Sequence, residues 1–365
     1  MTIEQELAQQ TARDWQELEA GTLRFAMIGL GWWTLEEAIP AVEQSDFCET
    51  TVVVSGGAEK AARVRDEHES IERGLTYDEF VDGAATEAYD AVYVCTPNAL
   101  HKEYVEAAAE HGKAVLCEKP LEASVERAEE LVAAARDGDI PLMTAYRMQT
   151  DPDVRRMREL IRDGAIGEPL AVEGHMTQTM VEVVSEDTSN WRVDPDMAGY
   201  GASVMDLGIY PLNTARFVLD AEPVAAQASM RSDSQAFSDV PDEAANFLVE
   251  YADGTTASCI ASQNAKLSGR FSVIGTEGEL TIEPIFLAQT PQTLTLRRGE
   301  EQSITVDTGR RDLMGHEMTE EFDYFADRVL REVSIGPDGE HGLQDMRALK
   351  AIYDAAERGE RVAIE

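Results

Sequence analysis

Two glycines follow directly on the first apolar run of the chain, where they can bring the backbone close to a phosphate. The run from Leu23 to Ile28 predicts a buried strand, Gly29-Leu30-Gly31 comes next, and a helix is expected to follow. A helix N-terminus presents amide groups and a positive dipole end to a pyrophosphate. The pattern predicts a dinucleotide site. The alternative is an ordinary turn, since Thr34 stands where a third glycine is usual.

The end of the second predicted strand indicates which dinucleotide would bind. After Thr51 to Val54 come Ser55-Gly56-Gly57 and then Lys60, with no carboxylate where an acid would accept a hydrogen bond from a ribose 2′-hydroxyl. A hydroxyl and an ammonium can instead hold a 2′-phosphate. We therefore expect NADP. The alternative is a turn followed by a surface lysine.

A third motif, Glu118-Lys119-Pro120, follows the fourth predicted strand, Ala114 to Cys117. In a doubly wound sheet, ligands bind at the carboxyl ends of the strands. A lysine at that edge can reach both a nicotinamide and a substrate hydroxyl. The alternative for Lys119 is a surface charge.

The elements that position these motifs are short buried strands alternating with amphipathic helices, a pattern typical of parallel strands with right-handed crossovers. We expect an α/β fold: a helical arm over 1–22, a Rossmann domain with a doubly wound parallel sheet over 23–150, and a catalytic and oligomerisation α+β domain with an open, mainly antiparallel sheet over 151–365. In the Rossmann domain, further strands are expected at 91–95 and 141–144, and helices at 38–42, 77–81, 101–111 and 124–136. In the second domain, strands are expected at 170–178, 224–230, 244–251, 255–262, 270–274, 279–282 and 293–296, and helices at 152–163, 316–332 and 343–358.

The composition is strongly acidic. Asp and Glu number 70 against 31 Lys and Arg, which gives a formal charge of −39, and only six of the basic residues are lysine. Such a surface repels nucleic acid and acidic membranes, and acid excess with few lysines is typical of halophilic cytosolic proteins. No secretion signal or 18-residue apolar span is visible, and the four cysteines form no metal-binding pattern, so we expect a cytoplasmic protein with buried thiols and no metal.

Taken together, the motifs resemble the Gfo/Idh/MocA oxidoreductase family from about residue 23 to 365. The resemblance rests on Gly29-Leu30-Gly31, on Thr96-Pro97-Asn98 followed by His101, and on Glu118-Lys119-Pro120. Within the family, the likeness is greatest to glucose-fructose oxidoreductases and haloarchaeal D-xylose 1-dehydrogenases. The segments that carry it are Ser55 to Ala61, Tyr146-Arg147, Asp151-Pro152, Trp191-Arg192 and Asp206 to Tyr210. Tyr200 departs from that branch, which often has glycine there.

The resemblance implies an NADP-dependent dehydrogenase that oxidises an aldose, with D-xylose favoured, at C1 to the lactone. Tyr210 would take the proton of the C1 hydroxyl, and Lys119 would stabilise the phenolate and orient the substrate, because an ammonium favours a nearby anion. Asp206, one helical turn before Tyr210, would contact the sugar or the lysine. Arg147 and Trp191 would also contact the sugar. The expected cofactor contacts are Gly29, Gly31, Trp33, Ser55, Gly56, Lys60, Thr96, Pro97, Asn98, His101, Glu118, Lys119, Arg147, Trp191 and Arg192.

Several of these residues have structural alternatives. Tyr210 could be an ordinary residue of an amphipathic helix, Asp206 an acid that interacts with a helix dipole, and Trp191 a core residue. His101 either contacts the cofactor or simply begins a helix. The competing functions are another oxidoreductase of the family, such as a glucose dehydrogenase, a glucose-fructose oxidoreductase or a dihydrodiol dehydrogenase, and a dinucleotide-binding regulator without turnover. Relatives pair through the open sheet, so a homo-oligomer is expected.

Overall fold

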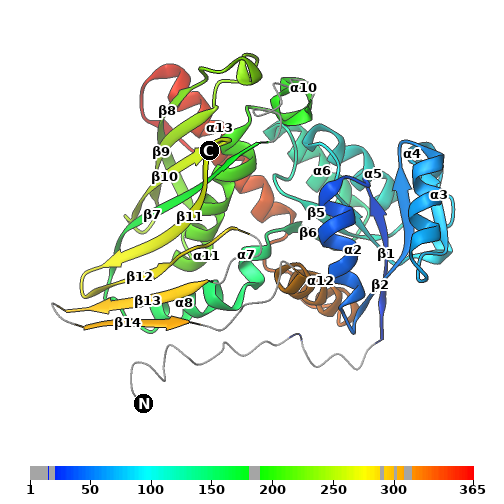
Figure 1. Ribbon diagram of the computed structural model, residues 1–365, viewed down its shortest axis with the longest axis horizontal. Helices are drawn as coiled ribbons and strands as arrows, with labels where there is room; N and C mark the ends of the chain where they lie inside the picture. Colours follow the sequence, from blue (N-terminus) through cyan, green and yellow to red (C-terminus); the bar gives the residue numbers. More distant parts are fainter. Residues whose placement is uncertain (1–14, 16–20, 181–189, 288–291, 300–301, 308–314) are drawn as a thin grey trace. The chain divides into compact units, whose positions relative to one another are not determined.

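The computed structural model describes residue 15 and residues 21–180, 190–287, 292–299, 302–307 and 315–365. The chain divides into two compact units (Figure 1). The first contains Arg13–Arg147 together with Met314–Gln344, and the second contains Met148–Leu313 and Asp345–Glu365. Residues 315–344 therefore belong to the same unit as the N-terminal part of the chain. The predicted arm over 1–22 lies outside the described residues except for Trp15 and residues 21–22.

The first unit is built on a six-stranded, all-parallel sheet in the order β3-β2-β1-β4-β5-β6, as the sequence pattern predicted. Apolar runs form its central strands, which are buried on both faces. Its strands are β1 (Leu23–Ile28), β2 (Cys48–Ser55), β3 (Arg73–Thr76), β4 (Ala91–Val94), β5 (Ala114–Glu118) and β6 (Leu142–Ala145). Its helices are α2 (Ile39–Glu43), α3 (Ala58–Glu67), α4 (Tyr77–Val81), α5 (His101–Glu110), α6 (Val125–Asp137) and α12 (Gly315–Leu330), with short turns η1 (Thr34–Ala38), η2 (Thr86–Ala88) and η3 (Asn98–Leu100).

One strand of this sheet was missed by the sequence analysis. The segment β3 has a single buried residue, Leu75, and so lacks the apolar run that marks the other strands. The strand that ends at Glu118 is therefore the fifth in the chain and not the fourth.

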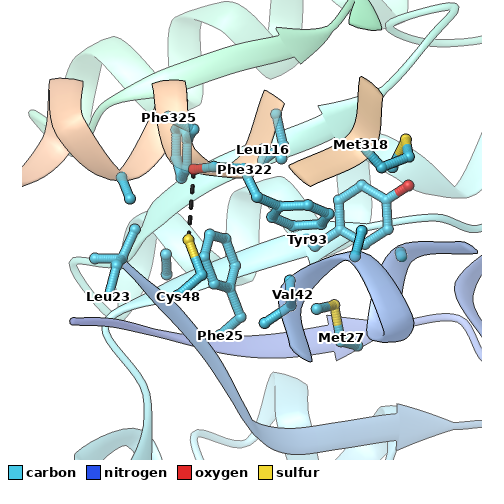
Figure 2. Packing of buried hydrophobic residues seen from close by; sticks show 14 of the residues in the cluster. Leu23, Phe25, Met27, Val42, Cys48, Tyr93, Leu116, Met318, Phe322 and Phe325 are labelled. Atoms are coloured by element: carbon cyan, nitrogen blue, oxygen red, sulfur yellow. Dashed lines mark hydrogen bonds between the residues drawn. The ribbon is translucent and has the colours of Figure 1, made fainter. Parts of the chain in front are cut away.

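Helix α12 belongs to the core of this unit (Figure 2). The ring of Phe322 packs edge-on against Phe25 and Tyr93, with centroids 5.1 Å apart in both pairs. The Cys48 thiol lies 3.5 Å from the Phe322 carbonyl oxygen. Trp15 also packs here: its ring meets Tyr324 at 5.3 Å. A helix from late in the chain is thus required to bury the apolar face of the Rossmann sheet.

The second unit contains a nine-stranded sheet in the order β14-β13-β12-β11-β7-β10-β9-β8-β15. Among the described strand pairs of this nine-stranded sheet only β7–β10 is parallel, which confirms the predicted open, mainly antiparallel sheet. The strands are β7 (Pro169–Thr179), β8 (Pro223–Arg231), β9 (Ala244–Tyr251), β10 (Thr256–Ser262), β11 (Asn264–Gly275), β12 (Gly278–Ile282), β13 (Thr293–Arg298), β14 (Gln302–Asp307) and β15 (Val362–Ala363).

Helix α11 (Ile209–Leu219) contacts β7 and β10, so it covers one face of this sheet. On strand β9 buried and exposed residues alternate, which indicates that the opposite face is open. The other helical segments are α7 (Arg147–Thr150), α8 (Pro152–Arg162), α10 (Pro195–Ala198) and α13 (Gly339–Arg358), with short turns η4 (Trp191–Val193), η5 (Val204–Gly208) and η6 (Gln235–Phe237). None of the helices in the described ranges has the length and apolar character needed to cross a membrane.

Candidate active site

The glycine turn after β1 has a distinct role for each of its two glycines. Gly29 has φ +92°, and a Cβ on it would lie 2.3 Å from the Cys95 carbonyl oxygen, so only glycine fits against the neighbouring strand. A Cβ on Gly31, in contrast, would meet nothing within 4 Å. The protein itself does not require glycine at position 31. Close approach of a bound phosphate would require it.

Thr34 explains the missing third glycine. Its side chain is fully buried, and its hydroxyl donates a hydrogen bond of 2.6 Å to the Gly29 carbonyl oxygen. It begins a π-helical turn, η1, in which the Ile39 amide donates to the Thr34 carbonyl oxygen. The threonine therefore closes the turn by a side-chain hydrogen bond in place of close helix packing.

Lys60 lies at the same edge of the sheet as the glycine turn. Its ammonium donates a hydrogen bond of 2.5 Å to the carbonyl oxygen of Leu30, between the two glycines. Ser55 is buried at the end of β2, and its hydroxyl oxygen is 3.5 Å from the Gly57 amide. The Ser55 hydroxyl therefore lies beside the Gly57 amide, and the Lys60 ammonium lies at the glycine turn. Hydroxyl, amide and ammonium groups are the kinds of group that can hold a phosphate.

The loop after β4 carries Thr96, Pro97 and Asn98, followed by His101. The Thr96 hydroxyl is buried without a hydrogen-bond partner among the described residues. The His101 ring is buried, and its Nε2 and Nδ1 lie 3.0 Å from the Thr96 and 3.2 Å from the Leu121 carbonyl oxygens. Burial lowers the pKa of this imidazole, and a neutral ring can donate to only one of the two carbonyls. His101 begins α5 and holds the β4 loop near the segment after β5.

The segment after β5 presents Glu118 and Lys119, both half-buried. The Glu118 carboxylate accepts hydrogen bonds from the Tyr93 hydroxyl (2.6 Å) and from the Lys119 amide (3.1 Å). The Glu118 side chain therefore holds the Lys119 amide and is itself oriented by Tyr93 on the adjacent strand β4. The Lys119–Pro120 peptide is cis.

Arg147 lies two residues after the end of β6 and is buried. Its guanidinium forms an ion pair with Glu317 on α12 and lies 5.9 Å from the centre of the Trp33 ring. The Trp33 ring nitrogen is buried without a hydrogen-bond partner in the described part of the chain. Arg147 and Trp33 therefore form one cluster at the carboxyl edge of the sheet.

Glu321 is a member of this region that the sequence analysis missed. It lies one turn after Glu317 on α12, and both of its carboxyl oxygens are buried without a hydrogen-bond partner among the described residues. Burial raises the pKa of Glu321 well above its usual range, the Glu118 carboxylate adds to that effect, and Arg147 opposes it. Glu321 lies far along the chain from Glu118 at the end of β5, so no local sequence pattern would identify it.

In the second unit, Asp206 and Tyr210 share one helix face. Between Gly201 and Val218 every residue is buried except Asp206 and Tyr210, which are half-buried. Asp206 lies in the π-helical turn η5, where the Ile209 amide donates to the Val204 carbonyl oxygen, and Tyr210 lies in the first turn of α11. Single π-helical turns of this kind are frequent at functional sites.

The Asp206 carboxylate is held by two side chains. Its Oδ2 accepts hydrogen bonds from Arg192 Nε (3.0 Å) and from Gln263 Nε2 (2.7 Å). The Arg192 guanidinium lies 4.5 Å from the centre of the Trp191 ring. Gln263, which is fully buried, was not predicted as a site residue. Its partner is 57 positions away in the chain, so no local pattern identifies it.

The predicted site residues are therefore distributed between the two units. Trp191, Arg192, Asp206 and Tyr210 belong to the second unit, and all the other predicted site residues belong to the first. Apposition of Lys119 and Tyr210 remains a prediction. The described residues contain no cluster of three or more His, Cys, Asp or Glu side chains that could hold a metal ion.

Comparison with known proteins identifies the family. Residues 23–146 match the model described as an oxidoreductase family with an NAD-binding Rossmann fold, and residues 154–281 match the GFO/IDH/MocA C-terminal domain. Along 97% of both chains, the sequence is 50% identical to the D-xylose 1-dehydrogenase [NADP(+)] of Haloarcula marismortui. The chain belongs to the Gfo/Idh/MocA oxidoreductase family.

Two further relatives agree with this assignment. The D-xylose 1-dehydrogenase (NADP(+)) 2 of Haloferax volcanii is 27% identical, with 94% of this chain and 100% of that protein covered. The crystal structure of aldose-aldose oxidoreductase from Caulobacter crescentus, complexed with glycerol, superposes with a TM-score of 0.83 at 29% identity, covering 94% of this chain and 99% of the other. These similarities cover both units.

Proposed function

We propose that this oxidoreductase oxidises D-xylose at C1 with NADP, yielding the lactone, NADPH and a proton. The observation that carries the proposal is the 50% identity along nearly the whole length to an NADP-dependent D-xylose 1-dehydrogenase. The end of β2 supports the choice of NADP, because Ser55 and Lys60 are present there and the half-buried lysine ammonium already lies beside the glycine turn.

The residues of the first unit fit a bound dinucleotide. Gly31 and Gly57 leave open space where a Cβ would stand, and the buried Thr96 hydroxyl has no partner among the described residues. Gly29 to Gly31 and the start of η1 would hold the pyrophosphate, and Ser55, Gly56 and Lys60 the 2′-phosphate. When bound, NADP supplies the acceptor for the C1 hydride.

The chain's own groups would handle the proton. Tyr210 takes the proton of the C1 hydroxyl, and the Lys119 ammonium stabilises the phenolate and orients the sugar oxygen. A base within hydrogen-bond reach accelerates such a step by about 10²- to 10⁴-fold. Asp206, held by Arg192 and Gln263, accepts a hydrogen bond from a sugar hydroxyl. Arg147 and Trp191 would complete the sugar contacts.

The experiment is a survey of NADP and NAD reduction with D-xylose, other pentoses, hexoses and trans-dihydrodiols in molar KCl. D-Xylose with NADP should give the highest kcat/KM. A preference for glucose or a diol would instead assign another activity of the same family, and no turnover with any of these compounds would contradict the proposal.

We also propose the cellular setting. The charge of −39 and the six lysines support a protein adapted to a salt-rich cytoplasm, and Cys48, Cys117 and Cys259 are buried free thiols. The exposed Leu248 on β9 and Ile260 on β10 support a homo-oligomer that pairs through the open sheet face.

A further inference from the structure

A buried carboxylate outside the predicted site anchors the segment that precedes the catalytic helix. Asp242 is fully buried and comes shortly before β9. Its two oxygens accept hydrogen bonds of 2.7 Å from the backbone amides of Ala202 and Val204. These amides belong to the residues at and just before the start of η5. Asp242 therefore acts as a capping group supplied from a segment 40 positions away.

Tyr353, on helix α13, completes this anchor. Its hydroxyl donates a hydrogen bond of 2.7 Å to Asp242 Oδ2 and accepts one of 3.3 Å from the Met205 amide. The backbone amides of Ala202, Val204 and Met205 thus all donate hydrogen bonds to one carboxylate–phenol pair, Asp242 and Tyr353. Gly201 fits closely beneath the pair, because a Cβ there would lie 2.3 Å from Asp242 Oδ1.

The same turn is connected to Asp206 by a second path. The Ser203 hydroxyl accepts a hydrogen bond from the backbone amide of Gln263 (2.9 Å) and donates one to the backbone carbonyl oxygen of Glu243 (3.0 Å). The Gln263 side chain then donates to Asp206. A shift of the turn that Asp242 holds would therefore move both the backbone that carries Asp206 and the side chain that orients it.

We propose that Asp242 and Tyr353 are positioning residues, which hold η5 in the π-helical conformation that presents Asp206 and Tyr210 on one half-exposed face. The inference rests on the proposed roles of Asp206 and Tyr210. It predicts that catalysis requires the ionised form of Asp242. A protonated carboxyl would turn a hydrogen-bond donor toward backbone amides that need an acceptor.

The surroundings of Asp242 make its titration accessible to experiment. Burial raises the pKa of Asp242 to about 6, against the opposing effect of its hydrogen bonds from Tyr353 and the backbone. The titratable groups around it are Tyr353, Tyr200, whose ring is 5.9 Å from that of Tyr353, and Glu243, which the Asp233 and Ser234 amides engage. Protonation below about pH 6 should weaken the hydrogen bonds that orient the turn and thereby lower kcat.

Two variants test this inference with the whole protein. In Asp242→Asn the side-chain amide nitrogen faces a backbone N–H, so kcat should fall at least tenfold. The acid limb of the kcat–pH profile, which is the fall of kcat below about pH 6, should disappear in this variant. In Tyr353→Phe, loss of one donor should raise the pKa of Asp242, which moves the acid limb upward by about half a unit. NADP binding should be unchanged in both variants. Tyr89→Phe is the matched control, because the buried Tyr89 hydroxyl has no hydrogen-bond partner in the described residues of the first unit.

Thermal unfolding separates positioning from folding. A carboxyl whose pKa is raised by folding contributes stability below its unfolded value of about 4, and that contribution is lost as the pH rises to about 6. The Tm difference between wild type and Asp242→Asn should therefore shrink from pH 4 to 6, while wild-type kcat rises over the same range. If the wild type oxidises the sugar but the acid limb of the kcat–pH profile lies at the same pH in Tyr353→Phe as in the wild type, the inference is overturned. Absence of sugar oxidation at every pH would overturn the proposed function.

Discussion

At the scale of single residues, Lys60 determines the expected choice of cofactor. We predict that Lys60→Ala raises the KM for NADP by roughly 10- to 100-fold, since a charge-assisted contact is worth about 1.5 to 3 kcal/mol. The KM for NAD should change little, because NAD has no 2′-phosphate. Steady-state kinetics with both cofactors measure the difference.

Lys102→Ala is the control for this substitution. The Lys102 ammonium pairs with Glu130 and Glu106 on the surface of helices α5 and α6, and its removal should leave both KM values unchanged. An equal loss of affinity for NADP and NAD in Lys60→Ala would indicate that the lysine only stabilises the turn through the Leu30 carbonyl.

The two glycines of the first turn should respond to alanine in opposite ways. Gly29→Ala places a Cβ against the Cys95 carbonyl at a positive φ, and we expect it to lower the free energy of unfolding by about 2 to 4 kcal/mol. Gly31→Ala meets no protein atom and should leave stability nearly unchanged while weakening dinucleotide binding. Denaturant unfolding and NADPH fluorescence titration of both variants provide the two readouts. Similar behaviour of both variants in both measurements would contradict the assignment.

At the scale of elements, the sequence predicted the positions of most strands because each combines an apolar run with a flanking turn residue. It did not predict β3, which has one buried residue, or the two strands after its last predicted strand, β14 and β15. It also did not predict the π-helical turns η1 and η5, because a backbone hydrogen bond between residues five apart leaves no periodic pattern. The motif residues of the site were identifiable from local spacing. Asp242, Gln263 and Glu321 were not, since their neighbours lie far away along the chain.

Helix α12 illustrates the same limit. Its own helical pattern was visible in the sequence, but its partner was not. The packing of Phe322 on Phe25 and Tyr93 joins segments hundreds of positions apart, and only the folded chain shows that this late helix completes the core of the Rossmann unit.

At the scale of the whole molecule, the charge of −39 should make stability depend on salt. Repulsion among surface carboxylates opposes the compact state, and molar salt reduces the screening length to about 3 Å. We predict a Tm that rises steadily between 0.1 and 2 M KCl in thermal unfolding followed by circular dichroism. A Tm that is independent of KCl would show that the acidic residues are already compensated.

The open face of the nine-stranded sheet leads to a prediction about assembly. Leu248 and Ile260 are both 45% exposed, and the β9–β10 register, in which Leu248 pairs with Ser258, places them on the same face. Leu248→Glu combined with Ile260→Glu should reduce the molar mass found by light scattering to that of one chain. A wild-type protein that is already monomeric at micromolar concentration would refute pairing through this face.

The proposed mechanism requires the Lys119 ammonium and the Tyr210 phenol to act together on one sugar hydroxyl. The direct measurement is D-xylose-dependent NADP reduction by Lys119→Ala and Tyr210→Phe, with NADP affinity determined in parallel. We predict that kcat falls at least about a hundredfold in each variant while NADP still binds to Tyr210→Phe as in the wild type. Turnover at the wild-type rate in both variants would contradict this mechanism.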